Sequence, residues 1–181
     1  DGIFDAIKRV MDKFPTVGVE LFQNLDDYIL RENDYTVFHY KHEPKRFWCD
    51  IDDAPREEIC KLIFSDNPSV IDKLLEFSKD LVCDGSKFIR TDPKYAELQI
   101  DGTGKGEALV ELAKMYDIPK SQLCGIGNYY NDEPLITASG IGALVGDAPD
   151  DMKHLADYVT KASCDDGALA EFIYYLESKM G

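Results

Sequence analysis

The sequence predicts an α/β chain in two parts: an α+β unit over residues 1–100 and part of a parallel sheet with flanking helices over residues 101–181. Two observations support this division. In the second part, short apolar strands alternate with helical segments, which is typical of a parallel sheet with helices on its faces. The first part instead contains a hairpin and two long amphipathic helices. The chain of 181 residues, 44% of them hydrophobic, can bury a core and is long enough for two small domains.

The elements of the first part follow from its local patterns. Residues 1–14 carry apolar side chains at helical spacing, and Pro15 ends that helix. Residues 17–23 alternate in polarity, and with a strand at 28–31 they form a hairpin. Further strands are expected at 59–64, 87–91 and 96–100, and a helix at 67–81. The pattern of residues 34–43 is ambiguous and favours a short helix, whereas residues 44–55 are expected to be polar and irregular.

The second part begins with a glycine-containing loop at residues 101–104. Helices are then expected at 105–116, 131–138, 148–156 and 165–179, and strands at 123–127, 141–145 and 158–160. The strands are short and apolar, as buried strands of a parallel sheet are.

Charge and cysteine usage exclude several function classes. The net charge of −15 repels nucleic-acid phosphates and anionic lipids, so neither is an expected partner. An enzyme of phosphate esters with this charge needs a local cation, such as a lysine and a metal ion. The five cysteines include no CxxC pair, which indicates reduced, mostly buried thiols and a cytoplasmic location. No signal peptide or long apolar run is present.

Polar residues gather at three places in the second part. Lys105 stands between glycines where a loop becomes a helix, and there it could neutralise an anion or simply be solvated. Asn128, Asn131 and Asp132 follow an apolar strand, where parallel sheets bind ligands, but Asn131 or Asp132 could equally cap the next helix. Asp147 follows the next strand, where it could face the cleft or cap the following helix, and capping is the favoured interpretation.

The order and spacing of these residues resemble the C-terminal half of Cof-type (subfamily IIB-like) phosphatases of the haloacid-dehalogenase-like (HAD) superfamily. The resemblance runs over residues 98–181, and residues 1–100 resemble the cap of that family in layout. The matching stretches are KGEAL at 105–109, GNYYND at 127–132, GALVGDAP at 142–149, ADYVT at 156–160 and DG at 166–167.

The resemblance implies a partial Rossmann-like HAD core at 101–181 and a substrate-selecting cap at 1–100. It implies Mg²⁺-dependent hydrolysis of small phosphorylated metabolites, in which one aspartate attacks phosphorus and a second protonates the leaving group. Lys105 matches the catalytic and phosphate-binding lysine. Asn131 matches a phosphate- or substrate-binding position, and Asn128 and Asp132 match metal-binding positions.

Two departures from the family pattern qualify these expectations. The nucleophile motif should precede the cap, and the only similar stretch, residues 50–53 with the sequence DIDD, does not follow an apolar strand. We therefore expect this chain alone to be inactive. Asn128 brings no charge to the metal site, so Mg²⁺ binding should be weakened. One alternative is a pseudophosphatase, a non-catalytic binding or interaction protein that keeps the fold and the pocket. Another is a generic α/β domain without phosphate chemistry.

Two further expectations concern surfaces. A core sheet without its first strands exposes an apolar face, so self-association or pairing with a missing N-terminal core segment is expected. Substrate selection would fall to cap side chains that face the cleft. The aromatic side chains of Phe22, Tyr40 and Trp48 are candidates, although packing is the favoured role for each.

Overall fold

The computed structural model describes residues 2–37, 45–81, 83 and 85–180. The chain divides into two compact units, Asp1–Asp101 and Gly102–Gly181. They are called the N-terminal and C-terminal units below, and each is described by itself. Within the described ranges, every helix is too short or too polar to cross a membrane.

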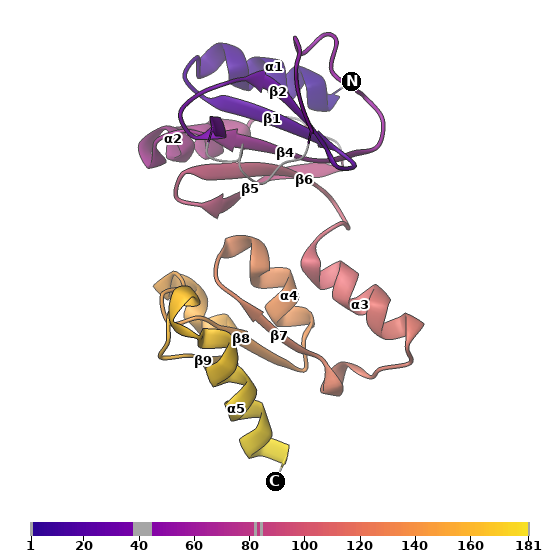
Figure 1. Ribbon diagram of the computed structural model, residues 1–181, viewed down its shortest axis with the longest axis vertical. Coiled ribbons are helices and arrows are strands. Elements are labelled where there is room, and N and C mark those ends of the chain that lie inside the picture. Colours follow the sequence, from indigo (N-terminus) through magenta and orange to yellow (C-terminus); the bar gives the residue numbers. More distant parts are fainter. Residues whose placement is uncertain (1, 38–44, 82, 84, 181) are drawn as a thin grey trace. The chain divides into compact units, whose positions relative to one another are not determined.

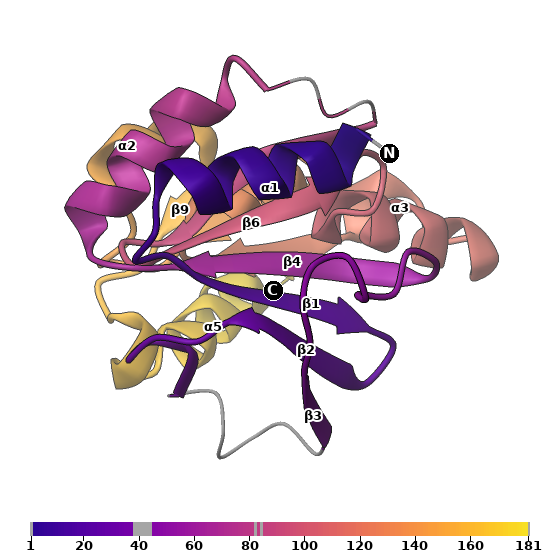
Figure 2. The same ribbon diagram turned by 90° about the horizontal axis from the view of Figure 1, so that it is seen from above.

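The N-terminal unit is built on a six-stranded sheet in the order β3-β2-β1-β4-β6-β5 (Figure 1, and Figure 2 for β3). Strand β3 runs parallel to β2, and all other neighbours are antiparallel. The hairpin expected near residue 25 is confirmed as β1 and β2. The strands are β1 (Gly18–Gln23), β2 (Asp26–Arg31), β3 (Lys45–Trp48), β4 (Ile59–Ser65), β5 (Ser86–Asp92) and β6 (Tyr95–Ile100).

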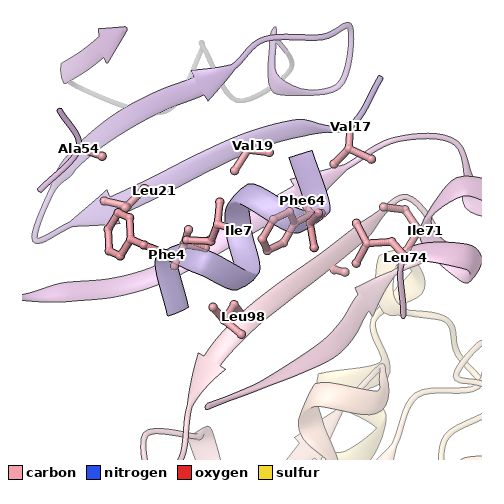
Figure 3. Close-up of a cluster of buried hydrophobic side chains, with 13 residues drawn as sticks. Phe4, Ile7, Val17, Val19, Leu21, Ala54, Phe64, Ile71, Leu74 and Leu98 are labelled. Carbon is pink, nitrogen blue, oxygen red and sulfur yellow. The ribbon is translucent and has the colours of Figure 1, made fainter. Parts of the chain in front are cut away.

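Helices α1 (Gly2–Lys13) and α2 (Pro68–Ser78) lie on one face of this sheet (Figure 2). Figure 3 shows Ile7 of α1 and Leu74 of α2 in one buried cluster with Leu21, Phe64 and Leu98 from three strands. These five side chains are at most 2% exposed. Burial of each such side chain contributes roughly 2 kcal/mol, so the helix-covered face is the core of this unit.

Strand β3 corrects the expectation that residues 44–55 are irregular. Arg46 of β3 places Nη2 3.0 Å from Glu20 Oε1 and 2.9 Å from Asp27 Oδ2. Both carboxylates are fully buried, and the Arg46 side chain is 8% exposed. Phe47 stacks on Tyr28 with ring centroids 5.2 Å apart. These contacts join residues far apart in sequence, so no local pattern could reveal them. Of the helix expected at 34–43, residues 38–43 lie outside the described residues.

The C-terminal unit contains a three-stranded parallel sheet in the order β7-β8-β9, which confirms the α/β expectation for this part. Helix α4 packs on β7, β8 and α3 (Figure 1). The elements are α3 (Lys105–Met115), β7 (Cys124–Gly127), α4 (Glu133–Ala138), β8 (Ile141–Leu144), β9 (Tyr158–Val159) and α5 (Ala168–Met180).

Two details differ from expectation. The segment expected to be a helix at 148–156 is the 3₁₀ helix η4 (Asp150–Leu155), a form common in short connectors. The cysteines are not mostly buried: Cys60, Cys124 and Cys164 are exposed, Cys49 and Cys83 are half-buried, and all five are free.

The Glu171 carboxylate fastens α5 to the segment after β9. It accepts hydrogen bonds from the amides of Lys161 and Ala162, each at 2.9 Å, and from the Tyr158 hydroxyl at 2.7 Å. These hydrogen bonds hold the pKa of Glu171 below its ordinary value of 4.5. The bond from the Lys161 amide has the largest effect, followed by those from the Tyr158 hydroxyl and the Ala162 amide. These bonds favour the ionised carboxylate.

Because the pKa of Glu171 is lowered by folding, its contribution to stability is complete above pH 4.5 and is lost as the pH falls through the lower, folded value. We expect Glu171→Gln to be less stable than the wild type near neutral pH, and this difference to shrink below pH 4.5. Urea unfolding at a series of pH values measures it, with Glu177→Gln on the exposed side of the same helix as the control. A difference that does not change with pH would contradict this account.

Candidate active site

Lys105 is the first residue of α3 and follows Gly104, whose extended backbone ends the connecting loop. Its side chain is 57% exposed, and Nζ lies 2.5 Å from Asp132 Oδ1. The loop-to-helix position expected for Lys105 is therefore confirmed, and its ammonium group is held by a carboxylate from another element. The side chain is thus both largely exposed to solvent, as a solvated lysine is, and paired with Asp132.

Asp132 ends η3 (Tyr130–Asp132), the 3₁₀ turn that follows β7. Its carboxylate is buried, and Oδ2 accepts hydrogen bonds from the amides of Asn128 at 2.7 Å and Tyr129 at 3.3 Å. A side chain at Gly127 would overlap Asp132, so glycine is required there. Asp132 thus stabilises the turn as a capping residue does and also binds Lys105.

The approach of α3 to α4 brings Lys105 to Asp132. Gly106 lies so close to Pro134 that a Cβ atom at position 106 would overlap the Pro134 carbonyl group. The absence of a side chain therefore sets the separation of the two helices at the end where Lys105 begins α3.

A cavity of about 300 Å³ lies beside this pair. Asn128, which is exposed, lines it together with Lys105 and Asp132, so three of the four predicted site residues come together. Asn131 is half-buried in η3 and is not among the lining residues. Apolar side chains form much of the remaining wall: Ile126, Leu135, Val145, Ala168 and Leu169.

A larger hollow, of about 620 Å³, lies between α3 and α4. Its charged lining residues are Glu107 and Glu111, which would repel an anionic ligand. The smaller cavity is the better candidate for a phosphate ester because Lys105 supplies a cation there.

Sequence reasoning did not find every residue near this site. Cys164 and Leu169 line the cavity although they lie more than thirty residues beyond Asp132, and no local pattern marks them. Asp147 is exposed and accepts a hydrogen bond from the Cys164 amide at 2.9 Å. It therefore stabilises the turn before α5, and the expectation that it caps the following helix is wrong.

The chemistry of the donors can be compared with that of a Mg²⁺ site. Among the described residues that line the cavity, Asp132 is the only carboxylate, and its two oxygens already bind Lys105 and two backbone amides. Asn128 offers a neutral amide. Over the described parts of the chain, no three acidic, histidine or cysteine side chains are grouped to hold a metal. Mg²⁺ requires about six oxygen ligands, usually including carboxylates, so these residues by themselves do not fit it.

Known proteins resemble this chain in sequence and fold. A phosphatase of Bacillus subtilis (strain 168), YwpJ, is 37% identical over 71 residues, which are 39% of this chain and 25% of YwpJ. A phosphoglycolate phosphatase of Methanoculleus marisnigri is 36% identical over 85 residues, 45% of this chain and 36% of that protein. The matched stretches thus span less than half of either relative.

The solved structure of BT4131, a sugar phosphatase of HAD subclass IIB, superposes with a TM-score of 0.78 at 18% identity. The superposition covers 96% of this chain and 65% of BT4131. A family model of haloacid dehalogenase-like hydrolases matches residues 3–173. The chain therefore belongs to the haloacid dehalogenase-like hydrolase family, and its fold is that of the Cof-type, subclass IIB phosphatases.

Proposed function

We propose that this chain is the cap and the C-terminal core portion of a phosphatase that acts on small phosphorylated metabolites. The observation that carries the proposal is the Lys105–Asp132 ion pair, which lies at the carboxyl end of β7 in a cavity shared with Asn128. Ligands of open α/β sheets bind at that end of the strands.

Lys105 is suited to bind a phosphate group. Its ammonium group donates to Asp132 and keeps two further N–H groups, and it lies at the start of α3, where the helix dipole favours an anion. In a protein with a net charge of −15, this local cation offsets repulsion of the substrate. Phosphoryl transfer is accelerated mainly by such positioning and charge stabilisation. Asn131 remains a proposed phosphate contact.

The proposal assigns different roles to the two parts of the chain. Residues 1–100 are proposed as the substrate-selecting cap and residues 101–181 as core. The DIDD stretch at 50–53 lies in a turn where Asp52 pairs with Lys8, which supports its rejection as a nucleophile motif. We therefore expect the chain alone not to turn over substrate. By the family resemblance, Mg²⁺ would be held by the complete site, with Asn128 and Asp132 at the matching positions.

The proposal extends to the cellular location and the partners of the protein. We propose a cytoplasmic location on the basis of the five free cysteines. The acidic charge is the reason for proposing no nucleic-acid or membrane partner. Exposed apolar side chains on the C-terminal unit support self-association or pairing with a further core segment. They include Leu112, Met115, Leu169, Ile173 and Tyr174.

A second candidate is phosphate-ester binding without hydrolysis, as in a pseudophosphatase. It is favoured by Asn128, which contributes no charge, and by Asp132, whose oxygens are already hydrogen-bonded.

Phosphate release by the protein encoded by the complete gene tests the proposal, with small sugar phosphates and phosphoglycolate as substrates and this 181-residue chain in parallel. We expect saturable release by the former and none by the latter. Binding of the esters without release would favour the second candidate. The absence of both binding and release would contradict both candidates.

A further inference from the structure

The described residues that line the cavity beside Lys105 carry no net charge, and this affects which ligand the proposed phosphatase site can hold. Lys105 and Asp132 cancel each other, and Asn128 is neutral. A carboxylate at position 128 would make the lining negative, as a cation site requires. The side chain at position 128 therefore decides whether the cavity attracts a divalent cation or a phosphate anion.

The hydrogen bonds of Asp132 also argue against a divalent cation in this cavity. Oδ1 binds the Lys105 ammonium at 2.5 Å, and Oδ2 binds the Asn128 amide at 2.7 Å. A Mg²⁺ ion on Asp132 would compete with Lys105 for Oδ1 or with the turn amides for Oδ2. Because Asp132 is buried and stabilises the turn, either loss would destabilise the C-terminal unit.

We propose that this site binds a phosphate group without a divalent metal ion, because Asn128 and the Lys105–Asp132 pair leave no net negative charge among the described lining residues to hold one. This inference rests on the proposed phosphate-binding function and departs from the metal dependence that the family resemblance implies. Lys105 is then the cation that binds the phosphate. The side-chain amide of Asn128 is neutral and does not repel the phosphate.

The test is a titration of the full chain with inorganic phosphate, in EDTA and in millimolar MgCl₂, followed through the amide NMR signal of Tyr129. That amide donates to Asp132 and so reports on the site. For the wild type we expect a phosphate dissociation constant that changes less than about twofold between the two buffers. MgCl₂ alone should not shift the Tyr129 signal in a saturable way.

The variant Asn128→Asp should reverse this behaviour. The new carboxylate repels phosphate, so binding in EDTA should weaken by about tenfold, and Mg²⁺ should restore it. Gln122→Glu is the matched control, because it adds the same charge at an exposed position that precedes β7, whereas Asn128 follows that strand. The control should behave as the wild type.

The possible failures can be told apart. Phosphate binding by the wild type that requires Mg²⁺ would overturn this inference and leave the proposed function standing. So would an Asn128→Asp variant whose phosphate binding is the same in EDTA and in Mg²⁺. A wild type that binds no phosphate in either buffer would overturn the proposed function and this inference with it.

Discussion

Replacing Lys105 with methionine is expected to lower the kcat/KM of phosphate release by about 100-fold or more, the usual effect of removing one group that stabilises transition-state charge. Methionine keeps an unbranched apolar stem but removes the ammonium group. The Asp132 carboxylate, held 2.5 Å from that group, would then be buried without a cation and would repel the substrate. Steady-state kinetics on the protein from the complete gene measure the effect.

Two control variants separate charge from folding. Lys114→Met removes a lysine from the same helix, where it pairs with Glu111 on the exposed surface, and should leave kcat/KM nearly unchanged. Lys105→Arg keeps the charge and should retain more activity than Lys105→Met. Wild-type kinetics in a folded Lys105→Met protein would contradict the assignment of Lys105.

Gly106→Ala is expected to destabilise the C-terminal unit by about 3 kcal/mol, the upper part of the range for overpacking a close contact. The added methyl group would overlap backbone atoms of Pro134, which cannot move aside as a flexible side chain can. Helices α3 and α4 must then separate, and Lys105 moves away from Asp132. Urea unfolding of wild type and variant measures the loss of stability.

Gly102→Ala is the control for this prediction. Gly102 has φ +78°, and a Cβ atom there would meet no atom within 4 Å. The expected cost is therefore only the conformational penalty of about 1 kcal/mol for alanine at positive φ. Equal losses in the two variants would mean that the contact between α3 and α4 does not determine the stability of this unit.

Much of the site could be predicted because its signals are local. The strand β7 is short, apolar and followed by polar residues, and α3 starts directly after a glycine loop. The rule that ligands bind at the carboxyl ends of parallel strands then places Asp132 in the site. The sequence does not distinguish capping from catalysis, because both require the same residue type at the same place. The Asp132 carboxylate binds the turn amides and Lys105 together.

The features that could not be predicted depend on contacts between residues far apart in the sequence. Strand β3 forms where Arg46 meets Glu20 and Asp27, and nothing in residues 44–55 alone indicates that pairing. The same holds for Asp147, whose partner is the Cys164 amide and not the helix beside it. Local patterns predict elements well but leave such tertiary partners open.

The most direct test of the account is the binding of inorganic phosphate to the 181-residue chain and to its Lys105→Met variant, followed through the backbone amide signals of Asn128 and Tyr129. Both amides donate to the carboxylate that holds Lys105. The account predicts saturable shifts in the wild type and none in the variant. Absence of shifts in the wild type, or equal shifts in a folded variant, would contradict the claim that Lys105 forms a phosphate site.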